Sequence, residues 1–143
     1  EDINNDLPVR NLIGSLQYIA SRTRPDIAAS LNYLSRFMQK PTKSVWNAVK
    51  NLLKYVKRTK DVKLNLGLNG NDELRVYSDA SHAVPPDRKS ITGVVIQLYG
   101  STVCWLSKKQ GGAIALSTAE SEYYALSKAV TEHVFYPILF ERQ

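Results

Sequence analysis

Three carboxylates are the residues of this 143-residue chain whose types and spacing could carry out chemistry. Asp79 stands near the end of a run of β-branched and aromatic residues, Leu74 to Ala80, that is typical of a β-strand. Glu120 and Glu122 follow in a stretch that begins like a helix. Hard divalent cations prefer oxygen ligands, and Mg²⁺ commonly takes one or two carboxylates. A strand and a helix that bring Asp79 close to one glutamate would form a site for Mg²⁺ or Mn²⁺.

The two glutamates have different local settings. Ser117 and Glu120 have the Ser-x-x-Glu spacing of a capping box, in which the glutamate side chain binds a backbone amide at the start of a helix. Glu122 has no such role, and it lies beside the apolar face that includes Ala125 and Leu126. We therefore predict Glu122 as the metal ligand, with Glu120 as the alternative.

Several strand-like runs and one helix must position these carboxylates. The strand-like runs are 74–80, 91–99, 101–106, 62–68 and the short run 113–116. Gly100 separates two of them, and a helix begins near Ser117. Strands that follow one another closely and are then followed by a helix predict an antiparallel meander backed by that helix.

The first part of the chain has helical rather than strand periodicity. Apolar residues recur every three or four positions, and three helices are predicted to start near Pro8, Pro25 and Thr42. We therefore predict a helical segment over residues 1–61 and a strand-rich region over residues 62–143. The fold class is α+β.

Basic residues form a second candidate site. Most of them lie on the third predicted helix, opposite its apolar residues, and two stand at a predicted turn after residues 84–87. The predicted nucleic-acid-binding residues are Lys43, Lys50, Lys54, Lys57, Arg58, Arg88 and Lys89. They form either a solvated surface or a surface that follows the phosphates of a nucleic acid. A net charge of +6 and a pI near 9.5 favour a polyanionic partner.

Four sequence blocks resemble the ribonuclease H domain of copia-type LTR retrotransposon polyproteins, in that family's order and approximate spacing. The blocks are Tyr77 to Ala80, Asp87 to Gly93, Trp105 to Gln110 and Leu116 to Leu126. The helical part is similar to the thumb-like segment that joins the polymerase to the ribonuclease H domain in those polyproteins. Its matching stretches are 12–18, 23–27, 34–38 and 53–60. The resemblance implies a thumb or connection segment followed by an incomplete ribonuclease H-like unit.

This resemblance also implies an activity, the metal-dependent hydrolysis of the RNA strand of RNA–DNA hybrids, with ions that bind the attacking water and the leaving oxygen. In that family the aspartate of the Ser-Asp-Ala block and the glutamate before Tyr-x-Ala are catalytic metal ligands. They fall on Asp79 and Glu122. The chain departs from the family at Ser81 and His82, where copia-type sequences usually have Asp-Trp, so substrate contacts at this turn are expected to differ.

The family's third carboxylate, the aspartate of an Asp-Asn block, has no counterpart, because no aspartate follows Asp87. We therefore expect hydrolysis to be weak or absent in this chain. The alternative is a domesticated or remnant module that binds nucleic acid or another protein without catalysis. A further expectation is that the rest of a polyprotein, or a second chain, completes the sheet at an open edge.

The sequence also restricts the expected cellular location of the protein. No run approaches the 18 or so apolar residues of a membrane span, and no stretch resembles a signal peptide. The lone cysteine, Cys104, excludes an internal disulfide and a cysteine-based zinc site. We expect an intracellular protein, cytoplasmic or nuclear, with no membrane partner.

Overall fold

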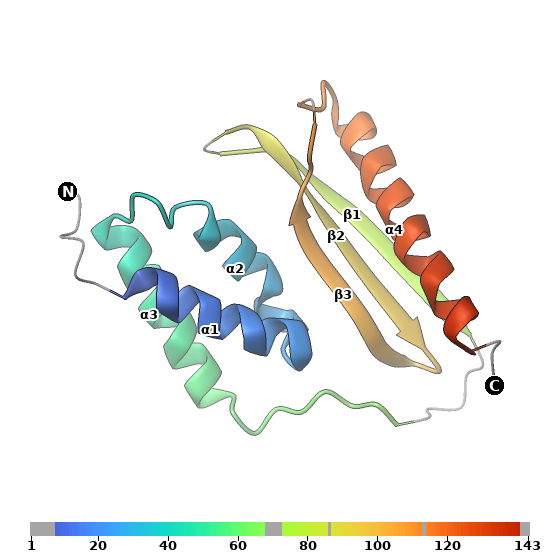
Figure 1. The fold of residues 1–143 in the computed structure, drawn as a ribbon, viewed down its shortest axis with the longest axis horizontal. Helices are drawn as coiled ribbons and strands as arrows, with labels where there is room; N and C mark the ends of the chain where they lie inside the picture. Colours follow the sequence, from blue (N-terminus) through green and yellow to red (C-terminus); the bar gives the residue numbers. More distant parts are fainter. Residues whose placement is uncertain (1–7, 68–72, 86, 113, 141–143) are drawn as a thin grey trace. The chain divides into compact units, whose positions relative to one another are not determined.

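The structure is a computed structural model that describes residues 8–67, 73–85, 87–112 and 114–140, with side chains up to residue 132. The chain separates into two compact units, Glu1–Leu64 and Asn65–Gln143. Figure 1 shows the helices of the first unit and the strands and long helix of the second. Within the described ranges, all strands belong to the second unit.

Helices form the described part of the first unit. They are α1 (Val9–Arg22), the 3₁₀ turn η1 (Pro25–Ile27), α2 (Ala28–Ser35) and α3 (Lys43–Arg58). The hydroxyl oxygen of Thr42 caps α3, because it accepts a hydrogen bond from the backbone N–H of Val45 at 3.3 Å. Pro8 directly precedes α1, and Pro25 is the first residue of η1, where a fixed φ and a missing N–H are tolerated. The three predicted helix starts are confirmed.

An apolar cluster holds these helices together. Its buried members come from all four elements: Val9, Ile13, Leu16, Ala20, Ile27, Leu31, Leu34, Val45 and Val49. Within the longer helices they recur three or four positions apart, so one stripe of each helix faces its neighbours. Burial of each large aliphatic side chain contributes about 1.5–3 kcal/mol. This cluster is therefore the main source of stability in the first unit.

The second unit is an antiparallel sheet covered by one helix (Figure 1). Its elements are β1 (Leu74–Val84), β2 (Lys89–Leu98), β3 (Ser101–Lys109) and α4 (Thr118–Phe140). The strands lie in the order β1-β2-β3, and α4 packs on β1 and β2. Tyr99 and Gly100 reverse the chain between β2 and β3 with φ values of 51° and 76°, a region that glycine enters without strain. The predicted antiparallel meander backed by a helix is confirmed.

Two weaker strand predictions were wrong for the residues that the structure describes. Residues 62–67 run as irregular chain, and Leu66 is 66% exposed. Residues 114–116 are also irregular. Alternating or apolar residues become a strand only where a neighbouring strand pairs their backbone groups, and neither stretch has such a partner. Leu68 and Ala113, which complete the two predicted runs, lie outside the described residues.

No helix in the described part of the chain is both long enough and apolar enough to cross a membrane.

Candidate nucleic-acid interface

The strand register determines which sheet face carries Asp79. Val94 and Ile96 of β2 are at most 1% exposed and pack with Ala129 of α4, so these residues face the helix. Val94 pairs with Ser78 of β1, and directly paired residues share a face. Successive side chains along a strand alternate between faces. Asp79, the next residue after Ser78, therefore lies on the face away from α4.

Glu122 lies on the helix side of the sheet. It lines a hollow of about 310 Å³ together with Ser78, Tyr123 and other residues of α4. The structure thus does not bring Asp79 and Glu122 together. A shared Mg²⁺ or Mn²⁺ ion would need a carboxylate oxygen from each residue at about 2.0–2.2 Å, and side chains on opposite faces of a sheet do not meet that requirement. This donor pair does not fit a shared ion.

Glu120 is engaged at the start of α4, as its spacing predicts. The backbone N–H of Glu120 donates to the hydroxyl oxygen of Ser117 at 3.1 Å. The backbone N–H of Leu116 donates to Glu120 Oε2 at 2.6 Å. The first bond satisfies an amide that the helix itself leaves without a partner, and the second holds the residue before the cap. The predicted cap is confirmed, and the Glu120 carboxylate has a structural role.

The lysines of α3 form a row on one side of the helix, here called the α3 lysine row. All of its members are exposed: Lys43, Lys50, Lys54 and Lys57. At 100° per residue they fall within an arc of roughly 60°, and at 1.5 Å per residue they extend along about 21 Å of the helix axis. Arg58, also exposed, flanks the row at its end. The buried residues Val45 and Val49 point to the other side.

The excess positive charge of the chain belongs entirely to the first unit. Residues 1–64 contain 12 lysines and arginines against 5 aspartates and glutamates, a net charge of +7. Residues 65–143 contain 7 against 8, a net charge of −1. The α3 lysine row therefore lies in a unit whose overall charge attracts polyanions.

Arg88 and Lys89 occupy the hairpin between β1 and β2, in the second unit. Arg88 is exposed and has a positive φ of 56°. Lys89 donates through Nζ to the carbonyl oxygen of Gly112 at 3.4 Å. The neighbouring carboxylate of Asp87 forms an ion pair with Lys109 at 3.0 Å. Because a carboxylate lies within this basic tip, its attraction for phosphate is weaker than that of the α3 lysine row.

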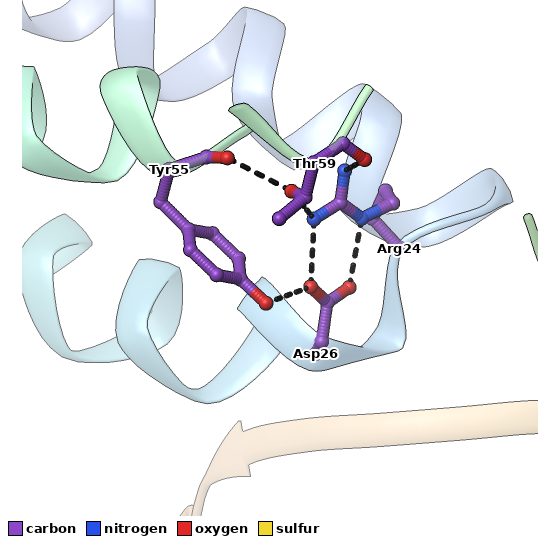
Figure 2. Close-up of polar contacts among 4 residues, drawn as sticks. All are labelled: Arg24, Asp26, Tyr55 and Thr59. Carbon is purple, nitrogen blue, oxygen red and sulfur yellow. Dashed lines mark hydrogen bonds and ion pairs between the residues drawn. The ribbon is translucent and has the colours of Figure 1, made fainter. Parts of the chain in front are cut away.

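A polar cluster fixes the C-terminal end of the basic helix (Figure 2). Arg24 donates from Nε and Nη2 to the two carboxylate oxygens of Asp26, at 2.9 and 2.8 Å. It also donates to the carbonyl and hydroxyl oxygens of Thr59, at 3.1 and 2.7 Å. Tyr55 donates to Asp26 at 2.9 Å, and its ring centre lies 5.5 Å from the Arg24 guanidinium carbon. The bidentate pairing with Asp26 fixes the orientation of the Arg24 guanidinium. The bonds to Thr59 join the α1–α2 junction to the end of α3.

Burial and pairing set the ionisation of this cluster. Hydrogen bonds from Arg24 lower the pKa of Asp26 below its ordinary value, although partial burial acts in the opposite direction. The same hydrogen bonds raise the pKa of Arg24 above its ordinary value. Both groups therefore remain charged at neutral pH.

The stretch around Pro25 was predicted from the sequence only as a helix start, and this cluster was not predicted. The Arg-Pro-Asp triplet was the available signal, because proline fixes the backbone between an acid and a base two residues apart. Nothing local indicates Tyr55 and Thr59, which are far along the chain.

Known proteins similar to this chain differ widely in length. A protein named secreted RxLR effector protein 161, from Plasmopara viticola, is 37% identical over 138 residues, and the match covers 96% of each chain. The retrovirus-related Pol polyproteins from transposon TNT 1-94 of Nicotiana tabacum and transposon RE2 of Arabidopsis thaliana are 40% and 39% identical, over 131 and 124 residues. The chain belongs to the same family as the Plasmopara viticola protein, and it is similar to one region of these retrotransposon polyproteins.

The copia-type polyproteins are much longer than the region they share with this chain. The matches cover 90% and 86% of the chain but only 10% and 8% of the tobacco and Arabidopsis polyproteins. The chain thus corresponds to one region of a retroelement polyprotein. No family model matches the sequence, and no solved structure matches it.

Proposed function

We propose that this chain is a retroelement-derived region that binds nucleic acid, such as an RNA–DNA hybrid, along α3. The observation that carries the proposal is the α3 lysine row, four exposed cations on one side of a helix in a unit of net charge +7. Lysines that neutralise phosphates release condensed counterions, which favours binding to any sequence. With four such contacts on a duplex, the logarithm of the association constant should fall with the logarithm of the salt concentration with a slope of about −3.6.

We also propose that the first unit is a thumb- or connection-like segment and that the second belongs to a ribonuclease H-like unit. Homology to Pol polyproteins over most of the chain supports a retroelement origin. The four sequence blocks, and an antiparallel meander backed by a helix, support the ribonuclease H-like assignment. The cap formed by Ser117 and Glu120 begins the helix on which the family's glutamate falls.

Binding without hydrolysis is the function we assign to the chain in this form. Hydrolysis with two metal ions needs carboxylates that converge on the reacting phosphate, and Asp79 and Glu122 lie on opposite sides of the sheet.

The binding proposal is tested by fluorescence anisotropy with a labelled RNA–DNA hybrid over a range of salt concentrations. The double variant Lys54→Gln/Lys57→Gln removes two members of the row and leaves the contact of Lys50 with Trp46 in place. We expect roughly tenfold weaker binding at moderate salt and a salt slope reduced by about 1.8. Arg10→Gln/Lys40→Gln is the matched control, since it removes the same charge from exposed positions outside α3. Equal losses in both variants would reject the row as the binding surface.

The same hybrid, incubated with Mg²⁺ or Mn²⁺, tests the absence of hydrolysis. We expect the RNA strand to remain intact, and we expect Asp79→Asn and Glu122→Gln to bind the hybrid as the unmodified chain does. Metal-dependent cleavage that disappears in Asp79→Asn would refute the assignment of a non-catalytic module.

A further inference from the structure

A hollow of about 300 Å³ lies in the second unit, between the end of β3 and α4. It is distinct from the hollow that Glu122 lines, and it contains none of the residues predicted from the sequence as site residues. The residues that the argument uses are Thr92, Lys108, Lys109, Gln110, Tyr124 and Lys128.

The floor of this hollow is polar and held in place. Thr92 is only 4% exposed, and its hydroxyl oxygen accepts a hydrogen bond from Gln110 Nε2 at 3.0 Å. The same amide nitrogen donates to the carbonyl oxygen of Ser121 in α4 at 2.9 Å. The backbone N–H of Gln110 donates to the carbonyl oxygen of Ser90 at 2.9 Å. Gln110 thus joins the sheet to the helix. In its bond with Gln110 the Thr92 hydroxyl acts as an acceptor, so that bond does not use its proton.

The rim of the hollow is cationic. Lys108, Lys109 and Lys128 line it, and no aspartate or glutamate occurs among its described lining residues. Lys108 pairs with Thr92 in the strand register, so its side chain projects on the face where α4 packs. Lys109 follows Lys108 along β3, so its side chain projects on the other face, where its amine pairs with Asp87 at 3.0 Å. The amine of Lys128 contacts Glu132 at 2.6 Å. An ammonium group has three donors, so the Lys128 amine retains donors for a further anion.

An aromatic ring stands beside these cations. Tyr124 of α4 lines the hollow and is 50% exposed. A base of a single strand can stack on such a ring while its phosphate contacts the lysines, and stacking of this kind contributes about 1–3 kcal/mol per base. Two cations, a buried hydroxyl donor and an exposed aromatic ring therefore match one nucleotide unit of a strand.

We propose that this hollow is a phosphate-binding pocket that takes one backbone phosphate of a nucleic acid strand. The choice of a nucleic acid as the source of the phosphate rests on the proposed function, whereas the pocket itself rests on the geometry of the second unit alone. It gives the unit of net charge −1 a local cationic site, separate from the α3 lysine row.

The test follows the side-chain amide signal of Gln110 by ¹⁵N NMR on the full chain. The probes are inorganic phosphate and a short single-stranded oligonucleotide. We expect a saturable shift of this signal with both probes, and tighter binding of the oligonucleotide because stacking adds to the phosphate contact. Lys108→Met should weaken both responses at least fivefold, and Lys128→Met should have a similar effect. Arg10→Met/Lys40→Met, in the first unit, should leave them unchanged.

Two results would overturn the pocket: the absence of a saturable shift with either probe, and an unchanged response in both Lys108→Met and Lys128→Met. A response to inorganic phosphate that the oligonucleotide does not produce would overturn the nucleic acid as the source of the phosphate. The variant Lys54→Gln/Lys57→Gln separates this proposal from that of the α3 lysine row. If the row is not a binding surface, anisotropy with the hybrid is unaffected by that variant, yet the phosphate response at Gln110 persists.

Discussion

The two units differ in how completely they bury their apolar residues and in where they carry charge. In the helical unit Ile13 and Leu16 are at most 1% exposed and belong to a cluster drawn from every helix. In the sheet unit burial is concentrated where β2 meets α4, and Tyr77 of β1 is 50% exposed. The helical unit also carries the net charge of +7. A well-packed basic helical unit can hold a binding surface rigidly, whereas the sheet unit depends on local contacts.

Truncation of a single side chain should therefore lower the free energy of unfolding of the two units by unequal amounts. Ile13→Ala is expected to lower the free energy of unfolding of the first unit by about 3 kcal/mol, because it leaves a cavity among fully buried neighbours. Tyr77→Ala should cost the second unit under about 1 kcal/mol, since half of its side chain is already in water.

Each unit contains one of the two tryptophans, Trp46 and Trp105, which makes this comparison measurable. Urea unfolding of Trp105→Phe reports on the first unit, and unfolding of Trp46→Phe reports on the second. Ile13→Val is the control, with an expected loss of about 0.5–1.5 kcal/mol. If Ile13→Ala shifted both tryptophan transitions equally, the units would unfold as one, and the contrast between them would fail.

Removal of the Arg24 guanidinium group should have the next largest effect on the free energy of unfolding. Arg24→Met leaves the Asp26 carboxylate without the partner that holds both of its oxygens. Removal of one partner of a fully buried ion pair costs about 3–5 kcal/mol of stability. Because the Asp26 side chain is 36% exposed and partly solvated, we expect Arg24→Met to lower the free energy of unfolding by about 2 kcal/mol. Arg24→Lys should lose about 1 kcal/mol, because an ammonium group cannot reproduce the two-pronged contact. If Arg24→Met shifted the unfolding transition reported by Trp105 as far as the one reported by Trp46, the effect would not be confined to the first unit.

Acidification should affect the same cluster. The pKa of Asp26 is lower in the folded than in the unfolded chain, so as pH falls the unfolded chain takes up this proton first. The stabilisation is complete above about pH 4, the ordinary pKa of an aspartate, and is lost as pH falls through the lower pKa of the folded state. Asp26→Asn should make the Trp46 transition less dependent on pH in this range. The effect is expected to be smaller than that of Arg24→Met, and an unchanged profile in Asp26→Asn would exclude this aspartate as the titrating group.

The features that could be predicted from the sequence are those that depend on residues close together in the chain. Helix starts, the α3 lysine row and the Ser117 cap depend on residues within a few positions of one another, and periodicity with capping chemistry located them correctly. The three strands and their order were also predictable, because the intervening turns are short. Alternation failed at residues 62–67, where a strand would have needed a distant partner that no local pattern can supply.

Non-local arrangement also limited the prediction of the candidate sites. Asp79 was predicted from its type and spacing, but the sheet face on which it lies depends on strand register, which a shift of one residue reverses. The link between Gln110 and Ser121 that shapes the pocket likewise forms only when α4 folds onto the sheet. Residue chemistry was readable from the sequence, whereas the convergence of side chains from different elements was not.

The smallest predicted effect compares the two glutamates on the first turns of α4. Glu120→Ala removes the acceptor of the Leu116 amide and should cost the second unit about 0.5–1 kcal/mol. Glu120→Gln should recover most of that loss, because an amide oxygen can accept the same bond. Glu122→Ala should change the free energy of unfolding by less than about 0.5 kcal/mol, since its exposed side chain lies outside the cap. The Trp105 transition measures all three variants. A Glu122→Ala loss as large as that of Glu120→Ala would mean that the hollow beside Ser78 has a structural role that its open position does not suggest.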